Sequence, residues 1–232
     1  PAETIPLVDA KDRDTALYLF SARRVELLPV DPTEDPSLVT GKAQSTSQPT
    51  SVLQFIGFNT AEGRLFSSAA LRAAFSRGID RETLVHAQLV QLALAAQFPF
   101  SPLSPLYPHS LETAYSEEAV LEALKEAGQD TGEERELTLL VSAGDAFRAA
   151  SARFIADHLS LLDWKIRVTA LPWEEYLAAL EAGEFDLYFG EVRLTADWDL
   201  TDLVGTGGAL NYGGYSSEAT DGLLLEFAGA EN

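Results

Sequence analysis

Charged residues cluster directly after a short apolar stretch near the end of the chain. The stretch Phe185–Phe189 is followed closely by Arg193, Asp197 and Asp199. Arginine binds carboxylate or phosphate groups through paired N–H donors, and a carboxylate accepts hydrogen bonds from ammonium and guanidinium groups. These residues therefore either line the mouth of a ligand site or cap a strand that emerges into water.

Each of these residues also has a simpler structural interpretation. Aspartate after a strand commonly forms a cap or a turn, and Arg193 can pair with Glu191 on the same surface. Such a surface pair contributes only about 0–1 kcal/mol, so stability alone gives little reason for it. Tyr212 and Tyr215, in "NYGGY", either form an aromatic wall or pack the end of a sheet, and we favour packing for Tyr215.

Catalytic chemistry is not expected from this sequence. Glu174 with Glu175, and Asp197 with Asp199, are carboxylate pairs of the kind that glycosidases use. Adjacent residues of a helix point apart, however, and no nucleophile-elbow, metalloprotease or nucleotide-binding motif with the right flanking elements is present. We therefore expect a binding protein rather than an enzyme. A carboxylate hydrolase is kept as a lower-ranked alternative.

The composition excludes several classes of partner and cofactor. Acidic residues number 36 against 16 basic ones, a net charge of -20, which repels nucleic acid and anionic membranes. The chain has no cysteine, so disulfides and thiolate metal sites are excluded. The three histidines, His86, His109 and His158, lack metal-ligand spacing. We expect no metal and no cofactor, although a carboxylate calcium site stays open.

Two features concern the membrane and the extent of the chain. The longest apolar stretch, Leu89–Phe100, is too short for a transmembrane helix. The sequence starts at Pro1 and contains no methionine. We therefore expect it to be an excised or processed piece of a longer protein.

Hydrophobic periodicity and end signals predict alternating helices and strands. Asp14, Asp80 and Ser116 are expected to cap helices, and Gly78 is expected to end one. Helices are predicted at 14–22, 116–128, 145–163 and 173–183, with a helix, break and helix within 67–90. Strands are predicted at 25–30, 52–59, 136–144, 164–172 and 185–189. A linker is predicted at 31–51, and an extended proline-rich connection at 98–108.

The order from Glu136 onward is strand, helix, strand, helix, strand. This alternation predicts a largely parallel sheet flanked by helices. Ligand sites in open α/β sheets lie outside the carboxyl ends of the strands, where the charged residues after Phe189 fall. We expect Asn59 to satisfy backbone groups at a strand end, Trp164 and Trp173 to be core residues, and Asp221 to cap a helix.

Several segments in order resemble one known family. They are "FIGFNT", "LRAAFSRGIDRETLV", "YSEEAVLEALKEAG", "LTLLVSAGDAFRAASARFIADHLSLLDWKIRV" and "LNYGGYSSEATDGLLLEF". Together they resemble the oligopeptide, dipeptide and nickel type of extracellular solute-binding protein of ABC importers. The resemblance implies an α/β fold, one lobe of a periplasmic-binding-protein type II-like fold with a mixed sheet flanked by helices. It implies that residues 1–50 are a crossover from a first lobe plus a linker, and that residues 51–232 are the second, C-terminal lobe.

The resemblance also implies a function. Members of the family bind a peptide or other small molecule between two lobes that close over it, outside the cytoplasm, and deliver it to permease subunits. It further implies that the full-length protein is anchored to the membrane. An alternative is a sensory or regulatory domain of the same shape fused to another module.

The sequence departs from the family pattern at the proposed site. Many members carry Gly-Trp after this strand, followed by an acid that pairs with the α-ammonium group of a peptide. Here "GEVRLTADWDL" replaces the tryptophan, and the acid corresponds to Asp197, or its place is taken by Thr195 or Ala196. Arg193 suits an anionic ligand group better than an ammonium. The predicted ligand contacts are Arg193, Asp197, Asp199 and Tyr212.

Overall fold

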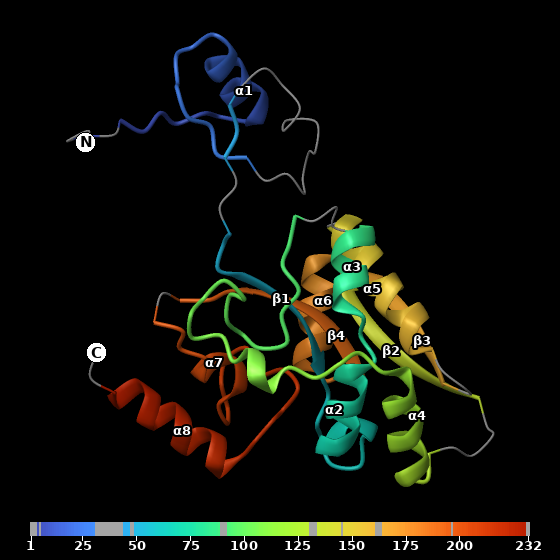
Figure 1. Ribbon diagram of the computed structural model, residues 1–232. Coiled ribbons are helices and arrows are strands. Elements are labelled where there is room, and N and C mark those ends of the chain that lie inside the picture. The colour runs from blue at the N-terminus through green and yellow to red at the C-terminus, as the bar shows by residue number, and fades with distance from the viewer. Residues whose placement is uncertain are drawn as a thin grey trace. The chain divides into compact units, whose positions relative to one another are not determined.

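The computed structural model describes residues 4, 6–30, 44–46, 49–88, 92–129, 134–144, 146–160, 164–195 and 197–230. The chain divides into two compact units, residues 1–47 and 48–232. Each unit is described by itself, and Figure 1 labels the elements of both. Most of the predicted linker at 31–51 lies outside the described residues.

The first unit contains helix α1, Arg13–Ser21. Its cap is Asp12, which accepts a hydrogen bond from the Thr15 N–H at 2.8 Å. The predicted cap, Asp14, is wrong, since it lies in the first turn. The predicted strand at 25–30 is also wrong, because these residues form turn and irregular structure and the described part of this unit offers no second strand to pair with.

The second unit is built on a four-stranded mixed sheet. The strands are β1 Val52–Phe58, β2 Arg135–Ser142, β3 Trp164–Leu171 and β4 Leu187–Arg193, in the order β1-β4-β2-β3. Strand β2 is parallel to both β3 and β4, whereas β1 is antiparallel to β4. The predicted mixed α/β sheet is confirmed, with β4 between β1 and β2.

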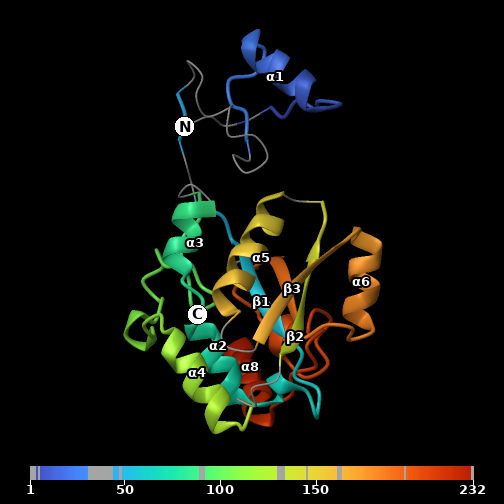
Figure 2. The same cartoon turned by 90° about the vertical axis from the view of Figure 1, so that its right-hand side faces the viewer.

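Helices cover both faces of this sheet (Figure 2). One face carries α6, and the other carries α5 together with α2 and α4. The helices of this unit are α2 Ala69–Arg77, α3 Arg81–Gln88, α4 Glu117–Glu126, α5 Ala146–Leu159, α6 Trp173–Glu181, α7 Thr201–Val204 and α8 Glu218–Gly229. Short 3-10 turns occupy Leu65–Ser67 and His109–Leu111.

Each face of the sheet has its own apolar core, because successive side chains of a strand point to opposite faces. On β4, Leu187 and Phe189 pack under α5, while Tyr188 packs under α6 with Tyr176 and Leu180. Trp164 is buried as predicted.

The prediction that Trp173 is a core residue is wrong, since 54% of its surface is exposed. It is the first residue of α6 and stacks on Tyr176 with ring centres 5.8 Å apart. The buried residues of this helix are Tyr176 and Leu180, and Trp173 covers Tyr176 from the solvent side.

Predicted helix ends are confirmed at several places. Ser116 accepts a hydrogen bond from the Ala119 N–H, and Asp80 accepts one from the Thr83 N–H. Gly78 ends α2, but with an ordinary φ of -74°. Glycine is required there for space, because an added Cβ would lie 2.6 Å from a methyl carbon of Val120.

Candidate ligand-binding edge of the sheet

Strand β4 extends further than its apolar residues indicate. The prediction ended it at Phe189, whereas the strand runs from Leu187 to Arg193. The reason is antiparallel pairing with β1 over its whole length, from Phe58 opposite Leu187 to Val52 opposite Arg193. Glu191 and Arg193 therefore lie within the strand, and only Asp197 and Asp199 follow it.

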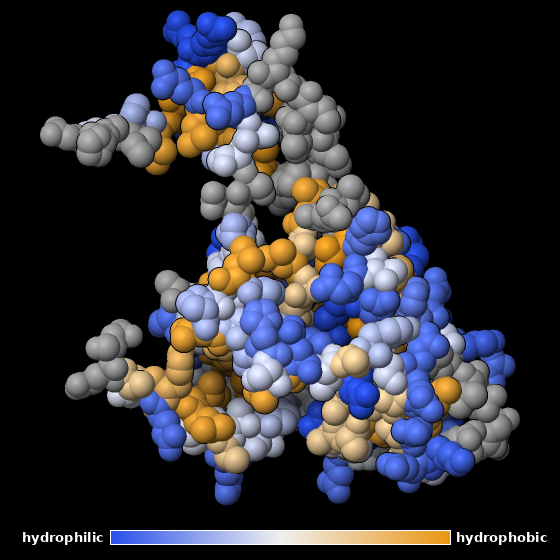
Figure 3. All heavy atoms as spheres, viewed as in Figure 1, coloured by the Kyte–Doolittle hydropathy of each residue, from blue (hydrophilic) through white to orange (hydrophobic). Residues whose placement is uncertain are grey.

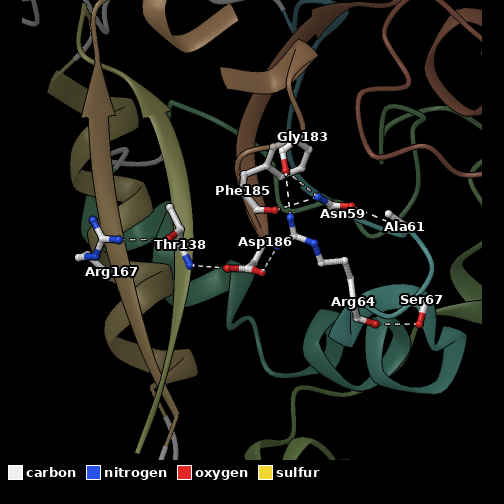
Figure 4. Close-up of polar contacts among 9 residues, drawn as sticks. All are labelled: Asn59, Ala61, Arg64, Ser67, Thr138, Arg167, Gly183, Phe185 and Asp186. Carbon is white, nitrogen blue, oxygen red and sulfur yellow. Dashed lines mark hydrogen bonds and ion pairs between the residues drawn. The ribbon is translucent and has the colours of Figure 1, made fainter. Parts of the chain in front are cut away.

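Polar side chains, of which Asn59 is buried, fasten the amino end of β4 (Figure 4). Asn59, at the end of β1, donates from Nδ2 to the carbonyl oxygens of Gly183 at 3.1 Å and Phe185 at 2.9 Å. Asp186 accepts from the Thr138 N–H at 2.9 Å and pairs with Arg64 at 3.5 Å. The structural role predicted for Asn59 is confirmed, and this end of the strand is tied into the fold.

The carboxyl end of β4 carries a second polar network. Glu191 Oε1 accepts from Arg148 Nη2, in the first turn of α5, at 2.8 Å. Its Oε2 accepts from Gln54 Nε2, on β1, at 3.0 Å. The alternative pairing of Arg193 with Glu191 is not formed, since the ion-pair partner of Glu191 is Arg148. Arg193 is exposed and makes no ion pair with any described residue.

The loop after β4 brings two of the predicted contacts together. A hydrogen bond from the Thr195 side chain lowers the pKa of Asp197, and one from the Thr201 side chain lowers the pKa of Asp199. Both carboxylates are therefore ionised at neutral pH. Asp199 Oδ1 also accepts from the Thr201 N–H at 2.9 Å, just at the start of α7. This is the turn-forming role described above for aspartate after a strand, and both side chains are exposed.

Trp198 lies between these two aspartates with its backbone in the left-handed region, at a φ of 58°. A non-glycine residue in this region is uncommon and costs free energy. Its indole stacks on Phe100, from the proline-rich connection, with ring centres 5.0 Å apart. The loop after β4 is therefore held against a segment far away in sequence.

Tyr212 lies on the other face of the sheet from Arg193. It is half-buried and packs edge to face against Tyr188, at 6.2 Å between ring centres, in the core under α6. Tyr215 is structural, since its hydroxyl lies 2.8 Å from Thr220 and Arg72 lies over its ring. The four predicted contacts thus fall into an exposed arginine, an aspartate pair and a tyrosine on the opposite face.

Asp221 does not cap a helix, so that prediction is wrong. The cap of α8 is Ser217, which accepts from the Thr220 N–H. Asp221 lies in the first turn and accepts from the Thr206 N–H at 2.9 Å. This bond fastens the loop before α8.

Two surface cavities of the second unit lie elsewhere. One, of about 360 Å³, is lined by residues that include Arg77, Asp80 and Gln97, and the other, of about 410 Å³, by residues that include Arg64 and Trp164. Neither is lined by a predicted contact residue. Within the described ranges, no cluster of three histidine, cysteine or acidic side chains is arranged to hold a metal. None of the described helices is both long and apolar enough to cross a membrane.

Comparison with known proteins decides the family. The family described as bacterial extracellular solute-binding proteins, family 5 Middle, matches residues 4–208. The chain belongs to this family. The resemblance inferred from the ordered sequence segments is therefore confirmed. A comparison with curated proteins by sequence gives no match.

Solved structures share the fold of this family 5 chain. The oligopeptide-binding protein AppA from Bacillus subtilis, in complex with a nonapeptide, has a TM-score of 0.74 at 20% identity, covering 94% of this chain and 47% of that one. HbpA2 from Haemophilus parasuis has a TM-score of 0.71 at 19% identity, covering 94% and 45%. NikA from Staphylococcus aureus, in complex with Ni(L-His)2, has a TM-score of 0.69 at 16% identity, covering 90% and 46%. The chain spans about half the length of these structures.

Proposed function

We propose that this chain forms part of a protein that captures a small solute, such as a peptide, outside the cytoplasm for an ABC importer. The second unit, residues 48–232, would be one of two lobes that close over the ligand. The observation that carries the proposal is the exposed charged edge at the carboxyl ends of β2 and β4, in a chain of the solute-binding family 5. Permease subunits and a membrane anchor belong to the same proposal.

The mechanism needs binding and closure but no bond chemistry. Hinged lobes exclude water when they close, which strengthens the charge-assisted contacts between them and the ligand. Arg193 would take an anionic group of the ligand, and Asp197 and Asp199 would take a cationic group. Tyr212, half-buried on the other face of the sheet, is proposed as a contact at the end of that face. Because one lobe supplies only part of the contacts, we expect this chain alone to bind in the millimolar range, about 4 kcal/mol or weaker.

Nuclear magnetic resonance can test this proposal at such affinities. The ¹⁵N-labelled chain would be titrated with tri-alanine and tetra-alanine up to about ten millimolar. We expect backbone signals of residues 191–199 to shift in a saturable manner. The double variant Asp197→Asn with Asp199→Asn should weaken the response, whereas Asp202→Asn, an exposed aspartate in the neighbouring α7, should not.

Two results would contradict the proposal. One is the absence of any saturable shift with either peptide, and the other is a saturable shift confined to residues remote from this edge. A longer two-lobed form that purifies with no bound solute, examined by native mass spectrometry, would favour the sensory alternative instead.

A further inference from the structure

A surface cavity of about 410 Å³ opens at the amino edge of the sheet. Arg135 and Trp164, the first residues of β2 and β3, line it together with the loop before α2 and the turn after α4. The charged residues at the carboxyl end of β4 lie at the opposite edge. At about 3.3 Å per strand residue, the two edges are about 20 Å apart. The cavity is therefore separate from the proposed ligand edge.

Arg135 is held on two sides by residues that also line this cavity. Its Nη1 donates to Gln129 Oε1, and its guanidinium carbon lies 5.3 Å from the centre of the Trp164 ring. A guanidinium group that is both stacked and hydrogen-bonded is already oriented. Binding an anion therefore costs Arg135 little conformational entropy.

Arg64 lines the cavity from the loop before α2. Its side chain is 47% exposed, and its contacts with the Asp186 carboxylate and the Gly183 carbonyl oxygen are 3.5 Å and 3.4 Å long (Figure 4). These lengths exceed the usual range for N–H···O hydrogen bonds, so they hold the guanidinium group weakly. Asp186 keeps a shorter bond, at 2.9 Å, from the Thr138 N–H. Arg64 can therefore turn toward an anion without leaving Asp186 unsatisfied.

The charge of the cavity differs from that of the chain. The described residues that line it include two arginines and no acidic residue, whereas acidic residues outnumber basic ones by 36 to 16 in the sequence. The carboxylates on either side of Arg135 in sequence are paired with other cations. With Asp186 counted beside Arg64, the local charge is +1 (two arginines minus one aspartate). A locally positive cavity on a strongly negative molecule attracts anions.

The cavity also offers a hydroxyl group and an apolar floor. Ser68 Oγ accepts from the Leu71 N–H at 3.4 Å, and no described residue accepts the proton of this hydroxyl. Leu71, Leu137 and Trp164 line the cavity and are buried. Apolar walls with a few placed polar groups are typical of small-molecule sites, and this volume lies within their usual range.

We propose that this cavity is a second binding site, for a compact oxyanion such as phosphate, sulfate or a carboxylate. Arg64 and Arg135 bind the anion from two sides, and the Ser68 hydroxyl donates a third contact. Guanidinium groups suit these ligands because their paired N–H donors match two oxygens of one anion. The site does not depend on solute capture, because it lies at the other edge of the sheet and uses none of the same residues.

One substitution separates this role from a purely structural one. Ser68 is the N-cap of α2, and aspartate caps a helix as well as serine does. Ser68→Asp therefore keeps the helix end and adds a negative charge to the cavity. Ser116→Asp makes the same change at the cap of α4, at the end of that helix remote from the cavity. The two variants have the same net charge and differ in where the charge lies.

The experiment uses the complete ¹⁵N-labelled chain and three probes: inorganic phosphate, sulfate and acetate. Each is titrated to about 50 mM at pH 7, with sodium chloride holding the ionic strength constant. The indole N–H signal of Trp164 reports on the cavity, and that of Trp173, on α6, is the internal reference. Thermal unfolding of every variant is measured first. Arg135→Lys, which keeps the charge without the planar donors, replaces Arg135→Gln if that variant unfolds.

We expect a saturable shift of the Trp164 signal. Arg64→Gln and Arg135→Gln should each weaken binding about fivefold to tenfold. Ser68→Asp should weaken it about tenfold or more, because the added carboxylate repels the anion. Ser116→Asp should change it by less than about twofold, since exposed charges this far apart are screened.

A further control tests whether any arginine of the sheet has the same effect. Arg167→Gln removes an arginine of β3 whose Nε lies 2.6 Å from Glu136 and which does not line the cavity, so binding should be unchanged. Tighter binding of phosphate and sulfate than of acetate identifies a tetrahedral anion as the ligand, and the reverse identifies a carboxylate.

Three results would overturn the proposal. The first is no saturable shift of the Trp164 signal with any of the three anions. The second is an affinity that neither Arg64→Gln nor Arg135→Gln reduces. The third is an equal loss of affinity in Ser68→Asp and Ser116→Asp, which would mean that only the overall charge of the chain matters.

Discussion

The indole ring of Trp198 stacks on the phenyl ring of Phe100, with centres 5.0 Å apart and planes inclined at 27°. The two residues come from the loop after β4 and from the proline-rich connection. Aromatic pairs of this kind contribute about 0.5–1.5 kcal/mol beyond the area they bury. The stack therefore offsets part of the cost of the left-handed backbone at Trp198.

Removing the stack should loosen the loop that carries the two aspartates. We expect Phe100→Ala to lower stability by about 1 kcal/mol or more and to speed amide hydrogen exchange at residues 195–201. Phe98→Ala is the matched control, because Phe98 packs on Tyr107 and not on Trp198. Equal effects of the two substitutions on the loop would show that the stack does not hold it.

Asn59 should be one of the most sensitive polar positions. It is 5% exposed. Its Nδ2 donates to the carbonyl oxygens of Gly183 and Phe185, and its Oδ1 accepts from the Ala61 N–H. Each buried group left without a partner costs about 1–3 kcal/mol. We expect Asn59→Ala to reduce the free energy of unfolding by about 3 kcal/mol, measured by urea denaturation. Glu184→Ala, an exposed neighbour of the same turn, should change it by less than about 0.5 kcal/mol.

Two glycines should respond to alanine in opposite directions. A Cβ at Gly78 would lie 2.6 Å from Val120 and 2.8 Å from Leu159, both fully buried, so Gly78→Ala should cost about 1–3 kcal/mol. A Cβ at Gly222, inside α8, would meet nothing within 4 Å, so Gly222→Ala should stabilise the helix by about 0.5–1 kcal/mol. Thermal unfolding measures both. A stabilising Gly78→Ala would mean that α2, α4 and α5 pack less closely than described.

The cap of α3 should make stability depend on pH. Hydrogen bonds from the side chain and backbone of Thr83 lower the pKa of Asp80 below its ordinary value of 3.8. Because the folded pKa is the lower one, the stabilisation is complete above the unfolded pKa and is lost as pH falls through the folded pKa. Asp80→Ala should cost about 1 kcal/mol at pH 7 and less in strong acid, where the protonated carboxyl keeps only a neutral oxygen acceptor.

Asparagine separates the cap from the charge at this position. Asp80→Asn keeps an oxygen acceptor, so we expect near-normal stability at pH 7 with less loss on acidification than the wild type shows. Melting temperatures at pH 7 and pH 3 are compared for the three proteins. An Asp80→Ala variant that loses the same stability at both values would contradict the assignment.

Local signals predicted the second unit well. Caps at Asp80 and Ser116, the glycine at the end of α2 and the alternation in β3 located the elements, because these features act within a few residues. The prediction of a strand at 25–30 was wrong because it rested on local apolar content alone. An apolar stretch forms a strand only with a partner, and partners are distant in sequence.

The same limit applies to the charged edge. Glu191 and Arg193 belong to strand β4 because β1 pairs with β4 as far as Arg193. The apolar residues of β4 alone do not indicate this extension. Arg148 and Gln54 were missed because both contacts depend on tertiary structure. The antiparallel pairing of β1 with β4 puts Gln54 opposite Glu191, and the parallel placement of β2 beside β4 brings α5 to the same carboxylate. Alternation along β4 did carry a usable signal, since it places Glu191 and Arg193 on the face that α5 covers. The ligand contacts Arg193, Asp197, Asp199 and Tyr212 stay predictions.

Helix α8 is hydrogen-bonded to the rest of the unit at its first turn and exposes apolar side chains beyond it. The helix is anchored through its first turn, where Asp221 and Thr220 make hydrogen bonds. Further along, Leu223, Leu225 and Phe227 are 66%, 76% and 50% exposed, and apolar side chains gather there in Figure 3. Hydrogen exchange should therefore be faster in the last two turns of α8 than in the first.

The order of strands in the sheet also determines when β1 can pair during synthesis. Strand β1 is made first but pairs with β4, which is made last, and Gln54 and Glu191 are 137 residues apart. At roughly 5–20 residues per second, on the order of ten seconds pass before β1 can find its partner. During that interval the backbone groups of β1 that face β4 have no strand partner.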